Sequence, residues 1–577
     1  MTVEQIRSLL QDISTETDCV DDQESDSDLS IEDVEVSDHE SNSEQDFSDN
    51  ESDLETSLGD STFYIGKDKI TKWQLKEFTT SKIRQHNIVN VVPGPKECAR
   101  NIVSEIDAFL KIIDLDMIDE IVTCTNMYIS NMRQRVQYSR PRDCLDTSRC
   151  EILAYFGLLF LIGIKKAHHA NVKELWSADG SGTEITRATM SYKRFLFLCR
   201  CLRFDDRGTR AERRVIDKLS PIRTTFDLFL KNINKNYNLS EYTTIDEMLH
   251  PFRGRCQWIQ YIPSKPAKYG IKMFALCDAK TFYTSKIEIY VGKQPPGPYE
   301  VSNSPIDIVK RLVTPIENSK RNLTTDNWYT SIPLADYLLQ KKITLTGTLK
   351  KNKREIPTEF LPHKKKEVGS SVFGFQKNKT LVSYVPRKNK AVILLSTMHH
   401  DSKIDVETRK PEIIIDYNCT KGGVDTVDKM CAAYSVSRIT KRWPLVIFYS
   451  LMNIAGINAQ VLFSYSKHNN APKIRRLFLK TLAFDLMKEH LAFRAQISSL
   501  PSDISSFLKI KYAVPSTSDV STTPPSKRGT CFECGRKKNA ATSMKCTKCM
   551  RFVCKLHSKK IIICEKCSNN DDNGNSE

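Results

Sequence analysis

Four aspartates are the side chains in this sequence best suited to do chemistry. Carboxylates from distant chain positions can hold two Mg²⁺ ions roughly 3.5–4 Å apart, which activate an attacking oxygen and stabilise a leaving one during phosphoryl transfer. The sequence therefore favours a two-magnesium site that acts on nucleic acid. The four residues are Asp246 in YTTIDEML (242–249), Asp326 in RNLTTDNWYTS (321–331), and Asp425 and Asp428 in TKGGVDTVDKM (420–430).

The elements around these aspartates must bring them together. Asp246 and Asp326 each close a run of β-type residues, which predicts that both emerge where a strand gives way to a loop or helix. The last two aspartates are three residues apart and would share one face of a helix that starts at the Gly422-Gly423 pair. Acidic residues are also favourable at any helix N-terminus, so this pair alone has an ordinary structural interpretation.

The formal charge of +16 is divided unevenly along the 577 residues. Residues 1–60 contain 21 acidic residues and one basic residue, so the other 517 residues carry +36. Lys and Arg that neutralise phosphates release counterions and supply most sequence-independent affinity for nucleic acid. We therefore expect a polyanion as the partner, although a solvated basic surface would give the same composition.

The order of the patterns predicts the architecture. The acidic start has too few apolar residues to offset the entropy of ordering, helical periodicity follows, then short β-type runs, then helices again. This order predicts an α/β core, a mixed sheet flanked by helices, inserted between two halves of a helical domain. The expected boundaries are 1–94 for an acidic disordered region, 95–241 and 435–512 for the halves of a helical dimerisation and DNA-binding domain, 242–352 and 412–434 for the parts of the core, 353–411 for a β-rich insertion, 513–530 for a linker and 531–570 for a zinc finger.

One stretch could be mistaken for a membrane span. Residues 443–466 contain no charged side chain, but polar residues recur along them and the rest of the chain is hydrophilic. We expect a buried helix here, and no membrane or small-molecule partner. The N-terminus lacks an uninterrupted apolar core, so no secretory signal is expected either.

A cysteine-rich segment predicts two Zn²⁺ sites. Seven of the 18 cysteines lie within residues 531–567, where they form four pairs with His557, each at two-residue separation. A disulfide module is the alternative, and the lack of a secretory signal argues against it. An interleaved, cross-brace pairing assigns Cys531, Cys534, Cys554 and His557 to one ion, and Cys546, Cys549, Cys564 and Cys567 to the other.

Other interpretations of this segment stay open. Sequential pairing of the ligands is possible, and interleaved ligands are also found in RING and PHD fingers that bind proteins or histones. Lys and Arg are abundant between the cysteines, which favours DNA and could also serve nuclear import.

Four segments resemble the conserved blocks of piggyBac-family DNA transposases in order and wording. The resemblance covers roughly residues 95–570. It implies an RNase H-like core in which Asp246, Asp326 and Asp425 form the acidic triad and Asp428 is an added Mg²⁺-binding carboxylate. The segments are TIDEMLHPFRGRCQWIQYIPSKPAKYGIKM (244–273), TTDNWYTSIPLADYLL (324–339), GTLKKNKREIP (347–357) and NCTKGGVDTVDKMCAAYSVSRITKRWP (418–444).

The resemblance also implies DNA contacts around the core. Lys350 and Lys353 match positions associated with strand transfer, where a cation could grip target phosphate; a solvated strand end is the alternative. Trp443 matches a tryptophan that stacks on an unpaired base, an interaction that contributes about 1–3 kcal/mol per base, whereas a core anchor is the alternative. Apart from the resemblance, phosphate contacts are expected from Arg253, Arg255, Lys265 and Lys268, with a solvated surface as the alternative.

The function that this resemblance implies is cut-and-paste DNA transposition. Such a transposase is a nuclease and strand transferase that cleaves transposon ends through hairpin intermediates and joins them to TTAA sites. We expect a nuclear homodimer, because two ends are handled together, with a finger that binds the terminal inverted repeats. A domesticated piggyBac-derived DNA-binding protein without transposition is the alternative, and a zinc-finger ubiquitin ligase or chromatin reader would explain only the C-terminal segment.

Overall fold

The computed structural model describes residues 35–36, 62–78, 89, 91–135, 141–466, 474–512, 529–534, 541–544, 546 and 551–559. The chain divides into two compact units, Met1–Ala513 and Val514–Glu577. All four aspartates belong to the first unit, so its architecture determines the geometry of the candidate site.

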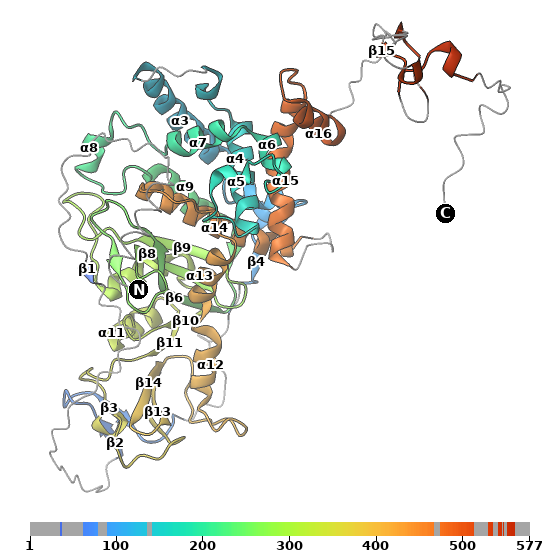
Figure 1. Cartoon of the computed structure of the whole chain (residues 1–577). Coiled ribbons are helices and arrows are strands. Elements are labelled where there is room, and N and C mark those ends of the chain that lie inside the picture. Colours follow the sequence, from blue (N-terminus) through green and yellow to red (C-terminus); the bar gives the residue numbers. More distant parts are fainter. Residues whose placement is uncertain are drawn as a thin grey trace, which may run out of the picture. The chain divides into compact units, whose positions relative to one another are not determined.

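A mixed sheet runs through the first unit (Figure 1). Strands β6 (Tyr242–Pro251), β10 (Asn322–Thr325) and β11 (Thr344–Thr348) are parallel neighbours, with β10 in the middle. On the other side of β6, strands β8 (Tyr269–Asp278) and β9 (Thr284–Ile289) follow in antiparallel order. The expectation of a mixed sheet with flanking helices is confirmed.

The segment predicted as an insertion extends this same sheet. Strand β14 (Lys390–Ser396) pairs antiparallel with β11, and β13 (Lys379–Arg387) and β12 (Ser371–Gln376) follow outward. The hairpin of β2 (Phe63–Ile65) and β3 (Lys72–Gln74) then pairs with β12. Four shorter strands are β1 (Glu35–Val36) and β7 (Gln260–Tyr261), which pair with each other in the main sheet, and β4 (Gly94–Pro95) and β5 (Tyr237–Asn238), which pair separately.

The β2–β3 hairpin corrects one prediction. Residues 62–78, which we call the N-terminal hairpin, fall in the region 1–94 that was expected to be disordered, yet they form two paired strands. The hairpin is ordered because it supplies apolar surface that the acidic stretch lacks, above all Trp73, which is fully buried. The predicted disorder of residues 1–60 concerns residues that lie outside the described part of the chain, apart from β1.

Helices precede and follow the core strands. The earlier helices are α2 (Glu105–Leu110), α3 (Leu115–Arg135), α4 (Arg149–Ile164), α5 (Val172–Leu175), α6 (Glu184–Thr189), α7 (Tyr192–Cys201), α8 (Arg210–Arg214) and α9 (Arg223–Asn236). The later helices are α12 (Glu412–Thr420), α13 (Gly423–Ala433), α14 (Trp443–Ser464), α15 (Arg475–Ala495) and α16 (Ser502–Tyr512). Short 3₁₀ helices are η2 (Glu97–Ala99), η3 (Pro141–Cys144), η4 (Thr314–Ile316) and η5 (Thr358–Phe360).

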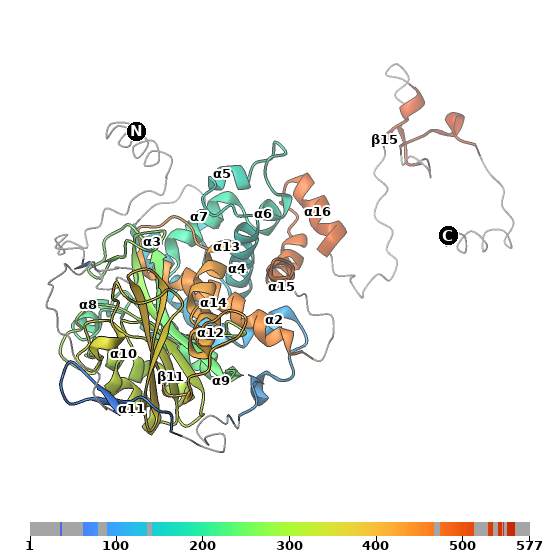
Figure 2. The ribbon, with the colours of Figure 1, turned by 90° about the horizontal axis from the view of Figure 1, so that it is seen from below.

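The two runs of helices pack against each other and against the sheet. Helix α4 contacts α15, and α2 contacts α14, so segments far apart in sequence share one hydrophobic core. Figure 2 shows α10 (Pro305–Leu312) and α11 (Ile332–Gln340) on one side of the strands, and α12, α13 and α14 on the other. The later helices therefore hold the chain that carries Asp425 and Asp428 against the sheet.

The long apolar helices are core elements. Every residue of α4 from Ile152 to Gly163 is buried, and Gly157 allows α15 to come close, since an added Cβ would lie 2.6 Å from the carbonyl oxygen of Ala483. Among the described residues α14 is the one helix with the length and composition of a membrane span, and 78% of that stretch is buried within the protein. This burial agrees with the core helix expected for residues 443–466.

The second unit contains the start of the predicted finger. It includes β15 (Gly529–Thr530), β16 (Ala541–Thr542) and the 3₁₀ helices η6 (Phe532–Cys534) and η7 (Lys555–His557). Most of the predicted linker 513–530 lies outside the described residues, as do three of the predicted zinc ligands, Cys549, Cys564 and Cys567.

Candidate active site

Backbone pairing places two of the aspartates side by side. The parallel register joins Ile245 of β6 to Thr325 of β10, and Asp246 and Asp326 directly follow these two residues. Neighbouring strands lie about 4.8 Å apart, and paired residues share one face of the sheet. Main-chain hydrogen bonds therefore bring these carboxylates together.

The position of Asp246 differs from the prediction. It was expected to close its strand, but β6 continues to Pro251 because pairing with β8 runs from Thr243 to Pro251. Asp326 does follow the last residue of β10, as expected. One carboxylate is thus fixed on a strand, and the other begins a turn.

The turn after β10 fixes Asp326. Its Oδ1 accepts hydrogen bonds from the backbone N–H groups of Trp328 (3.0 Å) and Tyr329 (3.4 Å). Ser331 then caps α11 by accepting from the N–H of Leu334. The Oδ2 atom of Asp326 is buried and has no hydrogen-bond partner in the described part of the chain. A buried carboxylate oxygen without a donor is well suited to a cation.

Threonines and a glycine seat α13 over the sheet. The Thr244 hydroxyl donates to the Thr420 carbonyl oxygen at 2.6 Å, and the hydroxyls of Thr324 and Thr420 lie 2.7 Å apart. An added Cβ on Gly423 would lie 2.8 Å from the Thr244 hydroxyl oxygen, so the helix can start this close to β6 only with glycine. Asp425 lies in the first turn of this helix.

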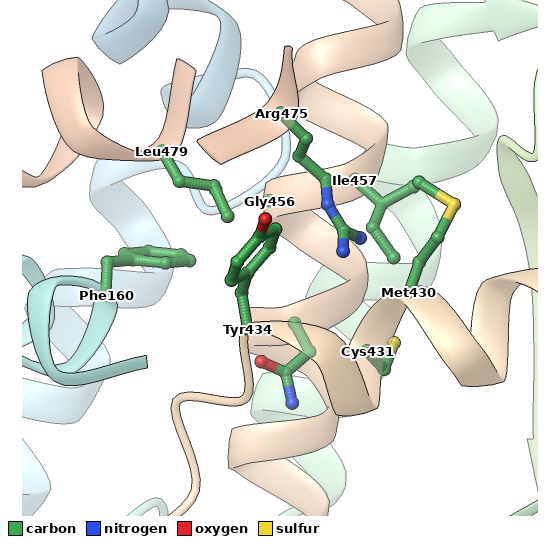
Figure 3. A pocket seen from close by; sticks show the side chains of 9 residues that line it. Phe160, Met430, Cys431, Tyr434, Gly456, Ile457, Arg475 and Leu479 are labelled. Carbon is green, nitrogen blue, oxygen red and sulfur yellow. The ribbon is translucent and has the colours of Figure 1, made fainter. Parts of the chain in front are cut away.

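The helical layer holds the other end of α13. The Arg475 guanidinium of α15 lies 5.0 Å from the Tyr434 ring centroid, and the N–H of Val436 donates to Asn453 Oδ1 at 3.0 Å. Figure 3 shows Arg475 reaching from α15 to between Tyr434 and Met430, beside a small hollow lined by α4, α13, α14 and α15. The helix that carries Asp425 and Asp428 is thereby fixed at both ends.

Asp246 lies within electrostatic reach of the other three carboxylates. Burial raises the pKa of Asp326 to about 7, and the charge of Asp246 adds to the rise. Burial also raises the pKa of Asp428 to about 6, with contributions from Asp425 and Asp246. The pKa of Asp246 is raised mainly by burial and further by Asp425.

Lys265 lies among these carboxylates. Its Nζ donates to Asp425 Oδ1 at 3.0 Å and to the Glu247 carbonyl oxygen at 3.0 Å, and only 14% of its side chain is exposed. Burial alone would lower the pKa of Lys265, but the carboxylates of Asp246 and Asp425 raise it. The residue was predicted to contact phosphate, and the structure places it against the carboxylates rather than on an open surface.

Cation binding fits this arrangement. Hard oxygen ligands from two to four carboxylates suit Mg²⁺, and the buried Oδ2 of Asp326 lacks a donor. Within the described residues, however, the only group of three or more potential ligands whose atoms lie within 4.8 Å of one another is a Cys/His cluster, so the carboxylates are more widely spaced. Like charges repel, which is consistent with this wider spacing.

The predicted DNA contacts take different positions. Lys350 and Lys353 are half-buried and follow β11, and the charge of Lys350 partly offsets the rise in the pKa of Asp326. Trp443 is half-buried at the start of α14, with its ring centroid 4.8 Å from that of Trp258 in an edge-to-face contact.

The remaining predicted contacts lie at the surface. The Arg253 guanidinium lies 5.2 Å from the Tyr269 ring centroid. Arg253, Arg255 and Lys268 are all exposed. They are free to meet phosphate, unlike Lys265.

In the second unit, the first and third Cys/His pairs converge. Cys531, Cys534, Cys554 and His557 have ligand atoms within 4.8 Å of one another. The sulfurs of Cys534 and Cys554 are 3.5 Å apart, and each lies 3.3 Å from His557 Nδ1. Tetrahedral ligands about 2.3 Å from one Zn²⁺ are roughly 3.5–3.8 Å apart, so this cluster has the dimensions of a zinc site. The interleaved pairing assigned these four residues to one ion, and of the other set only Cys546 is described.

Two residues near the site were missed from the sequence. Glu247 is 2% exposed on the opposite face of β6 from Asp246, and burial, followed by the Asp246 charge, raises its pKa to about 10. The consecutive acidic pair Asp246-Glu247 within a β-type run was the sequence feature that could have indicated it. Trp258 is 4% exposed and backs Trp443; no pattern in the sequence pairs these two tryptophans.

Comparisons with known proteins identify the family. A family model described as Transposase IS4 matches residues 104–460, more than half of the chain. A cryo-EM structure of the piggyBac transposase synaptic complex with hairpin DNA matches with a TM-score of 0.72 and 37% sequence identity, over 83% of this chain and 100% of that chain. The class is thus that of the transposases. Within it, the chain belongs to the piggyBac family.

Two human proteins are more distant relatives. The piggyBac transposable element-derived protein 3 and the chimeric ERCC6-PGBD3 protein are each 24% identical over 360 residues, which is 59% of this chain. The matches span 58% and 32% of those two proteins.

A pair of adjacent glycines tests how α13 is seated. Gly423→Ala should destabilise the protein by about 1–3 kcal/mol, because its Cβ would collide with Thr244. Gly422→Ala is the matched control, since its Cβ would meet only Thr426 Oγ1 at 3.9 Å. Chemical denaturation measures the free energy of unfolding of both variants. Equal values would contradict a close contact between Gly423 and Thr244.

The raised pKa values predict how Mg²⁺ stabilises the protein at different pH. The folded-state pKa values of Asp326 (about 7) and Asp428 (about 6) exceed the unfolded value, so their contribution to stability is full at acidic pH and is lost as the pH rises through 6–7. Mg²⁺ should offset this loss of stability by binding the charged carboxylates. At lower pH, protons compete with Mg²⁺ for the same carboxylates. The Mg²⁺-induced rise in melting temperature should therefore be larger at pH 8 than at pH 6.

Thermal melting with and without Mg²⁺ at both pH values measures this difference. In Asp428→Asn the difference between the two pH values should shrink, because one of the titrating carboxylates is gone. An equal Mg²⁺ effect at pH 6 and pH 8 in the wild-type protein would contradict the prediction.

Proposed function

We propose that this protein is a DNA transposase that cleaves transposon ends and joins them to target DNA by Mg²⁺-dependent phosphoryl transfer. The observation that carries the proposal is the convergence of Asp246 and Asp326, through strand register, with Asp425 and Asp428 on α13. The 37% identity to a piggyBac transposase in complex with DNA supports the same chemistry.

An RNase H-like core is part of this proposal. It is supported by the strand order β9–β8–β6–β10–β11, in which three antiparallel strands are followed by two that run parallel to β6. In this arrangement the first and fourth strands of the chain order are central neighbours, and they carry Asp246 and Asp326. Functional groups at the ends of central parallel strands are typical of α/β enzymes.

Each carboxylate has a distinct part in the proposed site. When bound, two Mg²⁺ ions would supply Lewis-acid activation of the attacking and leaving oxygens. Asp246 and Asp326 would contribute carboxylates from a rigid pair of strands. Asp425 and Asp428 would contribute theirs from α13. Lys265 would compensate negative charge between substrate turnovers, because its ammonium already contacts Asp425.

Neighbouring basic and aromatic residues complete the proposal. Lys350 and Lys353 would grip target phosphate beside Asp326, and Trp443, supported from behind by Trp258, would stack on an unpaired base. Arg253, Arg255 and Lys268 would contact the DNA backbone. Hairpin intermediates, TTAA targets, a homodimer and a nuclear location extend the family pattern to this chain.

The C-terminal segment would bind two Zn²⁺ ions in a cross-brace and read the transposon ends. The Cys531 cluster supports one of these sites by its ligand spacing. A domesticated DNA-binding role remains the second candidate, because the human relative is named as element-derived. The presence of all four acids favours the active enzyme.

Replacing a site aspartate should separate binding from cleavage. Asp246→Asn, Asp326→Asn and Asp425→Asn should each abolish cleavage of a labelled transposon end in Mg²⁺, because each removes a charged metal ligand. Binding of the end in a gel shift should be unchanged. Asp336→Asn in α11 is the control, since this exposed carboxylate pairs with Lys379. Cleavage that persists in all three variants would sink the proposed mechanism.

The zinc cluster gives a further test. Cys534→Ser should reduce the zinc content from two ions to one and weaken binding to transposon ends more than to random DNA, because a tetrahedral site loses one thiolate. Mass spectrometry under native conditions counts the ions, and fluorescence anisotropy compares the two DNAs. Cys98→Ser, at an exposed cysteine outside the finger, is the matched control.

A further inference from the structure

The N-terminal hairpin lies along the loop that carries Lys350 and Lys353. We call residues 349–357 the lysine loop. Four hairpin donors meet its carbonyl oxygens: Lys67 Nζ bonds to Lys351 at 2.8 Å, Lys67 N–H to Ile356 at 3.4 Å, Asp68 N–H to Arg354 at 2.9 Å and Trp73 Nε1 to Glu355 at 3.0 Å. A backbone bridge also joins Gly66 to Pro357. These partners are separated by more than 280 residues in sequence.

Apolar packing anchors the hairpin at this place. Trp73 is 0% exposed and fills space beside Gly374 of β12, where an added Cβ would lie 2.9 Å from the tryptophan Cβ. Tyr64 contacts Phe360 edge-to-face, with ring centroids 5.3 Å apart. The hairpin is therefore part of the core of this end of the sheet, and full burial of its tryptophan contributes about 1.5–3 kcal/mol or more.

Besides the hairpin contacts, the lysine loop is anchored near its two ends by the buried side chains of Leu349 and Ile356. Its start is tied to β14 by the Leu349 N–H, which donates to Ile393 at 2.8 Å, and a turn joins the Lys353 N–H to the Lys350 carbonyl oxygen at 3.2 Å. Its carbonyl groups at residues 351, 354 and 355 depend on the hairpin donors. Without the hairpin, this backbone would lose those bonds and the loop would lose its fixed path.

We propose that the N-terminal hairpin is a positioning element for strand transfer, which sets Lys350 and Lys353 in place. The proposal rests on the proposed function, in which these two lysines grip target phosphate. Among the described residues the hairpin's hydrogen bonds go to the lysine loop and not to the four carboxylates, so in this proposal it acts through the lysine loop. Its loss should therefore impair joining to target DNA while sparing the binding of transposon ends.

Full-length variants of the hairpin test this proposal. Trp73→Ala should speed hydrogen exchange of the amides in residues 350–357 and reduce joining of pre-cleaved ends by roughly tenfold to hundredfold, since misplaced contacts cost about that much. Trp73→Phe keeps an aromatic ring but removes the Nε1 donor, so it should show the same effects to a smaller degree. If Trp73→Ala fails to fold, Trp73→Phe provides the test.

Ile70→Ala is the matched control, because Ile70 lies in the same hairpin and is 81% exposed. It should change neither hydrogen exchange in the lysine loop nor joining. End binding and cleavage of the ends are measured in parallel, and both should stay close to wild type in every variant.

Unchanged exchange in residues 350–357 of Trp73→Phe and Trp73→Ala would overturn the proposal, as would faster exchange with undiminished joining. Hydrogen exchange is measured without DNA, so it tests the hairpin even if the wild-type protein joins no ends. A wild-type protein that joins no ends would refute the proposed function. The exchange data alone would then decide whether the hairpin holds the lysine loop in place.

Discussion

The structure depends on holding four like charges close to one another. Carboxylates repel, and burial increases the cost of their charged forms, which is why the pKa values of Asp246, Asp326 and Asp428 are all raised. Contacts made by other parts of the protein offset this cost and hold the carboxylates in place. Two of them are fixed by the register of parallel strands, and Lys265 brings a positive charge to the cluster.

Much of the remaining architecture can be understood from this constraint. Helix α13 has to approach β6 closely, which requires Gly423 and the threonine contacts below it. A helix pushed outward by repulsion must also be held from behind, and α4, α14 and α15 enclose its far end around Tyr434. Helices α14 and α15 follow the last carboxylates in the chain and pack against the helix that bears them.

The sequence predicted those features that are indicated by the residue pattern of one short segment. The β-type run before Asp326, the Gly422-Gly423 start of α13 and the apolar length of α14 each indicated an element that the structure contains. Sequence could not show where β6 ends, because pairing with β8 carries the strand past Asp246. It also missed the contact of Lys265 with Asp425 and the order of residues 62–78, since both arise from partners more than 150 residues away. Long-range pairing is invisible to local periodicity.

The two clusters of potential metal ligands differ in a way that matches different tasks. The Cys531 cluster is compact, with sulfur and nitrogen atoms 3.3–3.7 Å apart, and thiols can approach one another as neutral groups. The aspartates are spread more widely and come from three separate segments. Structural zinc sites are closed by protein ligands, whereas catalytic metal sites keep positions for substrate. The spacing of the ligands thus distinguishes a compact cluster with the dimensions of a zinc site from a wider group of carboxylates.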